Sequence, residues 1–124
     1  MAERDASQVL SPAPITAEIA STRLTLLEDG AERLRLLLQL IDSARTSVRL
    51  LFYMFGNDAA GDAVRDALAR AAARGCDVRL VVDSFGSGVT DDYFAPLTEA
   101  GGHCCLFHPV IGRRYLLRNH QKLV

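Results

Sequence analysis

Two stretches of the chain repeat their apolar residues at the spacing of an amphipathic helix. The first begins at Leu34 and continues at the i+3, i+4, i+7 and i+10 positions, with Asp29 as the expected N-terminal cap. The second follows Asn57 or Asp58 and ends at Gly75, since glycine enters the left-handed conformation at little cost. The inward stripe of this second helix is Val64, Ala67, Leu68 and Ala71.

Runs of strand length alternate with these helices. The predicted strands are Arg23–Glu28, Ser47–Phe55, Asp77–Asp83 and His103–Phe107. Ser47–Phe55 is a continuous apolar run, which is typical of an interior strand covered on both faces, and Asp77–Asp83 is nearly all apolar until Asp83. A further helical segment opens at Thr90 or Asp91 and restarts or kinks at Pro96. The alternation predicts the α/β class, with a mostly parallel or mixed sheet flanked by helices.

Composition places the 124 residues in one domain or part of one. The chain is 49% hydrophobic and 23% charged, which excludes a disordered chain, a collagen-like repeat and a coiled coil. No apolar run reaches the ~18 residues of a membrane-spanning helix, and Met1–Ala20 lacks the features of a secretory signal. We therefore expect a cytoplasmic protein, with a tail or docking segment over residues 1–22 and a partial α/β domain over residues 23–124.

Charge is distributed unevenly along the chain. The net charge is -1, so the whole molecule is not a polycation built to coat nucleic acid. From Gly102 onward there is no acidic residue, and the four cations are Arg113, Arg114, Arg118 and Lys122. A basic segment on an acidic body indicates an anionic ligand bound at one place, and a solvated basic loop is the alternative.

His120-Gln121-Lys122 is the strongest candidate for chemistry. A strand is predicted over Asn119–Val124, and alternate strand residues share a face, ~6–7 Å apart along the chain. An imidazole and an ammonium so placed can act on one phosphate, the nitrogen attacking phosphorus while the cation holds a non-bridging oxygen. Lys122 is the only lysine in the chain. An ordinary strand histidine beside a surface lysine is the alternative.

A second candidate lies where the Asp77–Asp83 strand ends. Asp83, Gly86 and Ser87 occupy the turn before a predicted helix, the position at which open α/β sheets bind ligands. The dinucleotide fingerprint fails there, because Asp91 occupies its third glycine position. A turn that orders the site is therefore favoured over a nucleotide-binding loop.

We expect no metal site. Cys104 and Cys105 are neighbours on a predicted strand, so their side chains diverge, and only Cys104 shares a face with His108. Four convergent ligands are lacking, and buried strand cysteines are the better interpretation. Tyr53 and Phe55 are likewise interpreted as packing residues.

Several groups of residues occur together in one order. They are LLEDG at Leu26–Gly30, SVRLLFYMFGNDAAG at Ser47–Gly61, AAARGCDVRLVVDSFGSG at Ala71–Gly88, then Phe94, Leu97 and Ala100-Gly101, and finally RNHQKLV at Arg118–Val124. From Leu24 onward, the chain resembles the first half of the phospholipase D superfamily, most closely its bacterial cardiolipin synthase-like branch.

The resemblance implies a role for each residue of the pair. The family motif is His-x-Lys, four residues, then Asp, followed later by Gly-Ser and Asn. His120 matches the nucleophile that forms a phosphohistidine, and Lys122 matches the phosphate-holding lysine. The motif aspartate would fall three residues past Val124, so we expect an incomplete first half-domain and no activity from these 124 residues alone. A second histidine from a second half-domain or a dimer partner would transfer the protons, and no cofactor or metal is implied.

The resemblance also implies the substrate. An anionic phospholipid, phosphatidylglycerol, would give cardiolipin if the acceptor is the hydroxyl of a second phosphatidylglycerol, and peripheral contact with the inner membrane would follow. Residues expected around the phosphate or headgroup are Arg113, Arg114, Arg118 and Asn119. The alternatives are a phosphodiesterase or nuclease of the same superfamily and a non-catalytic truncated binding module. The net charge disfavours nucleic acid.

Overall fold

The computed structural model describes residues 13–107 and Val124. The chain forms two compact units, Met1–Leu36 and Leu37–Val124. The strand predicted over Asn119–Val124 lies outside the described residues, apart from Val124 itself.

The first unit contains an antiparallel hairpin. β1 (Ile15–Ile19) pairs with β2 (Thr22–Leu26), with Ile15 opposite Leu26, and Ala20 takes a positive φ of 54° in the turn. β2 confirms the predicted strand, but β1 falls within residues 1–22, which were expected to be a tail or docking segment. Its sequence ITAEI is a short alternation that becomes a strand through its pairing with β2.

The helix α1 (Gly30–Ser43) begins and ends where polar groups satisfy its backbone. The Asp29 carboxylate accepts a hydrogen bond from the Glu32 backbone N–H at 2.9 Å, which confirms the predicted cap. At the other end, the Arg74 guanidinium donates to the carbonyls of Ile41 and Ala44 at 3.0 and 3.3 Å. Carbonyls at a helix end have no partner within the helix, so this arginine supplies one.

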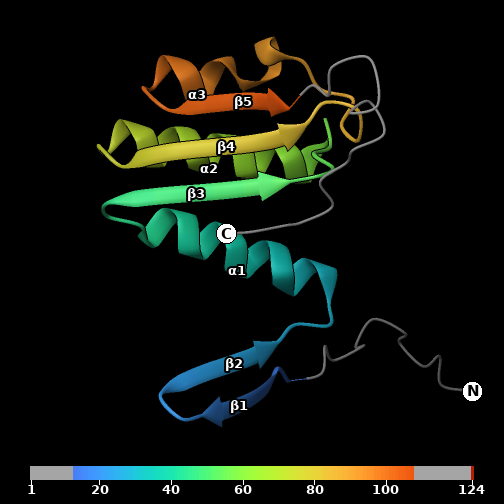
Figure 1. Ribbon diagram of the computed structural model, residues 1–124, viewed down its shortest axis with the longest axis vertical. Coiled ribbons are helices and arrows are strands. Elements are labelled where there is room, and N and C mark those ends of the chain that lie inside the picture. The colour runs from blue at the N-terminus through green and yellow to red at the C-terminus, as the bar shows by residue number, and fades with distance from the viewer. Residues whose placement is uncertain (1–12, 108–123) are drawn as a thin grey trace, which may run out of the picture. The chain divides into compact units, whose positions relative to one another are not determined.

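The second unit is built on a parallel sheet. β3 (Ser47–Phe52), β4 (Asp77–Asp83) and β5 (His103–Phe107) lie in that order and point the same way, as Figure 1 shows. Each crossover between parallel strands carries helix, as such connections require. The α/β class and the parallel sheet are thus confirmed.

Helices cover one face of this sheet. α2 (Ala59–Ala73) packs on β4, and the short helices η1 (Asp91–Phe94) and α3 (Ala95–Glu99) contact β5 (Figure 1). Asp58 caps α2, Gly75 follows it with a φ of 95°, and Pro96 lies in the first turn of α3, as predicted. The buried core between sheet and helices is Val48, Leu50, Val64, Ala67, Leu68, Ala71, Val78, Leu80, Val82, Phe94 and Leu97.

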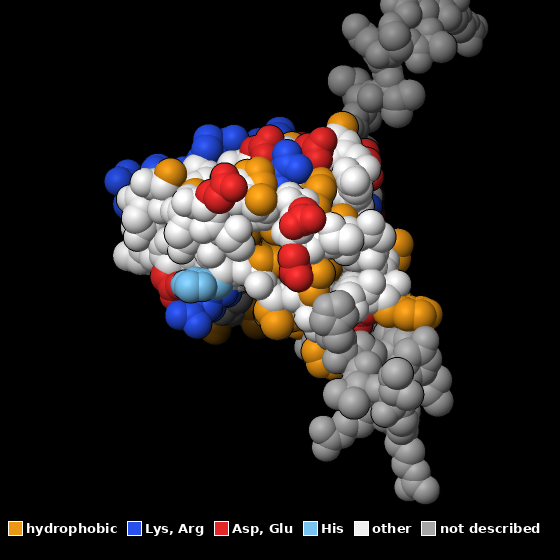
Figure 2. All heavy atoms as spheres, turned by 90° about the horizontal axis from the view of Figure 1, so that it is seen from above, with side chains coloured by type: hydrophobic (Ala, Val, Ile, Leu, Met, Phe, Trp, Pro, Cys, Tyr) orange, Lys and Arg blue, Asp and Glu red, His pale blue; other side chains and the backbone are white. Residues whose placement is uncertain are grey.

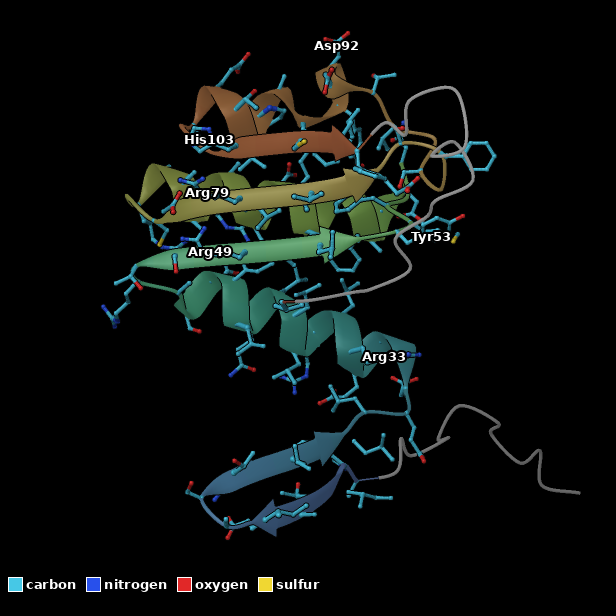
Figure 3. All side chains as sticks on the ribbon, viewed as in Figure 1. Arg33, Arg49, Tyr53, Arg79, Asp92 and His103 are labelled. Atoms are coloured by element: carbon cyan, nitrogen blue, oxygen red, sulfur yellow. The ribbon has the colours of Figure 1, made fainter. Side chains whose placement is uncertain are left out.

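The opposite face of the sheet is exposed at Arg49, Arg79 and His103, whereas Leu51 and Val81 on the same face are half-buried. The exposed part differs from the expectation that Ser47–Phe55 is covered on both faces. β3 is an edge strand there, and its residues alternate between exposed and buried from Ser47 to Leu50. Arg49, Arg79 and His103 lie side by side across the three strands on this face (Figure 3). Apolar strand runs do not by themselves distinguish a central strand from an edge strand. The arginine inside each run was the available signal of a polar face.

Asp77 joins the two arginines of this row. Its carboxylate accepts from Arg49 at 3.0 Å and from Arg79 at 3.1 Å. The hydrogen bond from Arg79, followed by the charges of both arginines, holds the pKa of Asp77 below its usual value. All three side chains are solvent-exposed, so these ion pairs add little to stability.

Leu68 and Leu40 test the core assignment as a matched pair. Leu68 is 0% exposed and Leu40 is 52% exposed. We expect Leu68→Ala to lower the free energy of unfolding by about 3 kcal/mol, because it leaves a cavity, and Leu40→Ala by less than ~0.5 kcal/mol. Urea denaturation followed by circular dichroism measures both, and equal losses would refute the described packing.

Candidate functional site: the carboxyl edge of the parallel sheet

The carboxyl ends of the three parallel strands meet at one edge of the sheet. Phe52 of β3 pairs with Val82 of β4, and Asp83 pairs with Phe107 at the end of β5. The residues that follow each strand are therefore neighbours in space. In open α/β sheets this edge is where ligands bind.

Ser87 joins the β4 loop to the segment that follows β3. Its Oγ accepts a hydrogen bond from the Phe55 N–H at 2.8 Å and donates to the Tyr53 carbonyl at 3.2 Å. Ser87 and Phe55 are both buried, so the first of these bonds satisfies a backbone N–H that water does not reach. Gly86 lies directly against Tyr53, and a Cβ at Gly86 would clash with the Tyr53 carbonyl and ring. Only glycine therefore allows this close approach.

Asp83 places a carboxylate within the same edge. Its side chain is 2% exposed, and Oδ1 accepts from the backbone N–H groups of Phe85 at 2.8 Å and Gly86 at 3.0 Å. Oδ2 is buried and has no hydrogen-bond partner among the described residues. A buried carboxylate oxygen is costly to leave unpaired, so Asp83 retains the capacity to accept one more strong hydrogen bond.

Ser84 attaches β5 to this edge and was missed by sequence reasoning. Its backbone N–H and its Oγ both donate to the Phe107 carbonyl, at 3.1 and 2.9 Å. A serine after a strand carries no distinctive signal by itself. Only the register of β4 against β5 brings Ser84 to Phe107.

Phe55 lies beneath the carboxyl edge and packs into the core. It is buried, and its ring meets Phe94 edge-to-face with the centroids 5.2 Å apart. Phe55 is therefore a packing residue, as predicted. Beside it, the Tyr93 hydroxyl donates to Asp62 at 2.7 Å, and burial followed by this carboxylate raises the pKa of Tyr93 to about 12.

The other predicted site residues lie outside the described residues. They are the pair His120 and Lys122, together with Arg113, Arg114, Arg118 and Asn119. The structure brings together Asp83, Gly86 and Ser87, and their part in a reaction remains a prediction.

The cysteines of β5 differ from expectation. Cys104 is half-buried, but Cys105 is exposed, so the prediction of two buried cysteines is wrong for Cys105. Cys105 lies on the same sheet face as Arg79 and His103, and these three residues are exposed in the described part of the chain. Across residues 13–107, no three His, Cys, Asp or Glu side chains gather in a group that could hold a metal ion. Among the helices described, none is long and apolar enough to cross a membrane.

The family model described as cardiolipin synthase, PLD-like domain, matches residues 37–124. The chain belongs to this family. It is 37% identical over 103 residues to the major cardiolipin synthase ClsA of Bacillus subtilis, covering 79% of this chain and 21% of the relative. It is 33% identical over 108 residues to cardiolipin synthase 1 of Bacillus anthracis, covering 83% of this chain and 21% of the relative.

A cardiolipin synthase of Listeria monocytogenes serotype 4a is 33% identical over 103 residues, again with 21% of the relative covered. The chain thus spans about a fifth of the length of these curated relatives. No solved structure matches it significantly. The predicted resemblance to the bacterial cardiolipin synthase-like branch is confirmed.

Substitutions of Ser87 and Ser43 test the hydrogen bonds that join the β4 loop to the segment after β3. We expect Ser87→Ala to lower the free energy of unfolding by about 1–3 kcal/mol, because the buried Phe55 N–H loses its acceptor. Ser43→Ala removes an exposed hydroxyl bonded to the Leu40 carbonyl and should cost less than ~0.5 kcal/mol. Chemical denaturation measures both, and an unchanged stability of the Ser87 variant would contradict the described bridge.

The two cysteines of β5 should differ in reactivity. Burial raises the pKa of Cys104 to about 11, so at pH 8 its thiol stays protonated, and only the thiolate is alkylated rapidly. Cys105 is exposed. We expect iodoacetamide at pH 8 to modify Cys105 first, as measured by peptide mass spectrometry. Earlier modification of Cys104 would show that β5 faces the other way.

Proposed function

We propose that this chain supplies one half of a phosphatidyltransferase site of the cardiolipin synthase type. The observation that carries the proposal is the His120-Gln121-Lys122 pair within a chain that belongs to the cardiolipin synthase family. The proposed substrate is phosphatidylglycerol, and the proposed place of action is the cytoplasmic surface of the inner membrane. Neither a metal nor a cofactor takes part in the proposed reaction.

The proposed reaction has two displacements at phosphorus. In the first, an imidazole nitrogen of His120 bonds to the phosphorus of phosphatidylglycerol, and the bond to the glycerol oxygen breaks. A second histidine gives its proton to the departing glycerol. In the next step, that histidine takes the proton of a hydroxyl on another phosphatidylglycerol, whose oxygen bonds to phosphorus as the P–N bond breaks. The Lys122 ammonium holds a non-bridging oxygen throughout.

The described edge of the sheet supports this proposal through its polarity and its connection to the motif. The chain continues from Phe107, at the carboxyl edge, into the segment that contains His120 and Lys122. Asp83 offers a buried carboxylate oxygen there that can accept a hydrogen bond. Because carboxyl edges are the usual ligand sites of parallel sheets, this is the edge at which we propose that the phosphate binds.

The count of motifs leads to a specific expectation for this polypeptide. His103 and His108 are not followed by lysine two positions later, so the 124 residues contain one His-x-Lys pair. The proposed reaction needs two histidines. We therefore expect these residues to bind the phospholipid and to require a second half-domain or a dimer partner for turnover. A non-catalytic binding module is the second candidate, favoured by this single pair.

Vesicle binding tests the proposed substrate. We expect phosphatidylglycerol vesicles to bind the chain more tightly than phosphatidylcholine vesicles, measured by sedimentation. Each arginine near an anionic surface adds about 1 kcal/mol, so Arg113→Ala with Arg114→Ala should weaken binding roughly thirtyfold. The matched control replaces Arg33 and Arg45, which are exposed, and should change affinity by less than about threefold.

A headgroup assay tests the catalytic pair separately. The soluble phosphodiester glycerophosphoglycerol should bind the chain, and Lys122→Ala should weaken that binding by about tenfold. Tighter binding of single-stranded DNA than of either lipid probe would favour the nuclease alternative instead. Cardiolipin made by the purified chain and lost in His120→Ala would show that the second histidine need not come from elsewhere.

A further inference from the structure

Three large apolar side chains are exposed at the carboxyl edge of the parallel sheet. Met54 follows β3, Phe85 follows β4, and Phe107 ends β5, with exposures of 65%, 63% and 41%. Figure 2 shows hydrophobic side chains at the surface on its right, the end toward which the strands point in Figure 1. We refer to Met54, Phe85 and Phe107 as the apolar rim.

Hydrogen bonds fix the backbone beneath the rim. Met54 lies between Tyr53 and Phe55, which are both bonded to Ser87. Phe85 donates its own N–H to Asp83, and its neighbour Ser84 is bonded to the carbonyl of Phe107. Met54 and Phe85 thus lie in loops, and Phe107 at the end of β5, that are held by hydrogen bonds. A rim held in place in this way loses little conformational entropy when it enters an apolar phase.

Charge along the chain favours an anionic surface as the partner of the rim. Directly after Phe107 the sequence carries four cations and no acid through Val124. The exposed acids Asp91 and Asp92 belong to η1, and Figure 3 shows Asp92 on the far side of β5 from β4. Tyr53, which precedes Met54 of the rim, lies beyond the end of β3 in the same figure. The four cations that follow Phe107 in the sequence outnumber these two acids and the exposed Asp58 that caps α2.

We propose that the apolar rim inserts into the interface of a phosphatidylglycerol-containing bilayer and holds the carboxyl edge against the headgroups. This inference rests on the proposed function, since a site that acts on a bilayer lipid must reach the headgroup layer. Interfacial amphipathic helices bury their apolar face ~5–10 Å into the headgroup boundary, and we expect the exposed side chains of the rim to enter to a similar depth. A stable protein interface buries about 800 Å² on each partner, far more than three side chains supply.

Vesicle binding of a polar double variant tests the rim. We expect Met54→Ser with Phe85→Ser to weaken binding to phosphatidylglycerol vesicles by at least about tenfold, because two apolar side chains no longer leave water. Leu24→Ser and Leu40→Ser are matched controls, since both leucines are about half exposed and neither belongs to the rim. Each control should change affinity by less than about twofold.

A tryptophan reporter measures insertion directly, because the chain contains no tryptophan. Phe85→Trp should show a blue-shifted emission on phosphatidylglycerol vesicles and quenching by lipids brominated on the acyl chain. Leu40→Trp should show neither change. This readout decides the proposal even if the double serine variant fails to fold.

The experiments distinguish a failure of the proposed membrane insertion from a failure of the proposed function. Loss of vesicle binding in the double serine variant, with unchanged binding of glycerophosphoglycerol, supports the rim. Quenching of the Phe85→Trp variant without any headgroup binding supports the rim while contradicting the proposed function. If the Phe85→Trp variant binds vesicles but its emission is not quenched, the proposed insertion of the rim is wrong. The insertion is also wrong if the double serine variant binds vesicles normally and loses only self-association, measured by sedimentation velocity. The latter result would make the rim a contact between copies.

Discussion

The hydroxyl of Ser87 is the contact on which the carboxyl edge of the sheet depends. It donates a hydrogen bond to the Tyr53 carbonyl and accepts one from the Phe55 N–H. These two bonds join the segment after β3 to the loop after β4. Asp83 closes the same loop from within, and Ser84 ties it to β5. Short polar side chains thus replace the ladder hydrogen bonds that end with the strands.

This closure has an electrostatic consequence. Backbone N–H groups of the loop donate to Oδ1 of Asp83, whereas Oδ2 is buried and has no donor among the described residues. A buried acceptor of this kind is expensive to maintain in a purely structural loop. Its presence beside the strand ends is consistent with an edge built to receive a polar or cationic group. The apolar rim lies on the same loops and at the end of β5, so polar and exposed apolar residues stand within a few positions of one another there.

Family membership and structure contribute different parts of the functional argument. The match to the cardiolipin synthase domain covers residues 37–124, which is also the span of the second compact unit. The arrangement of that unit explains how strand ends distant in sequence come to share one edge. The relatives are about five times as long as the matched region. The proposed chemistry needs two histidines, and these residues contain one His-x-Lys pair, so we propose that the second histidine comes from outside them.

Local signals in the sequence determined the helices and their limits. Asp29 and Asp58 cap because a short carboxylate reaches free backbone N–H groups, and Gly75 ends α2 because it takes a positive φ cheaply. Only the tertiary structure decided that β3 ends at Phe52, that Cys105 is exposed, and that Asp83 keeps one oxygen unpaired. Capping and periodicity act between residues a few positions apart. Strand order, face coverage and loop-to-loop hydrogen bonds join residues some 20–35 positions apart, whose pairing no local pattern encodes.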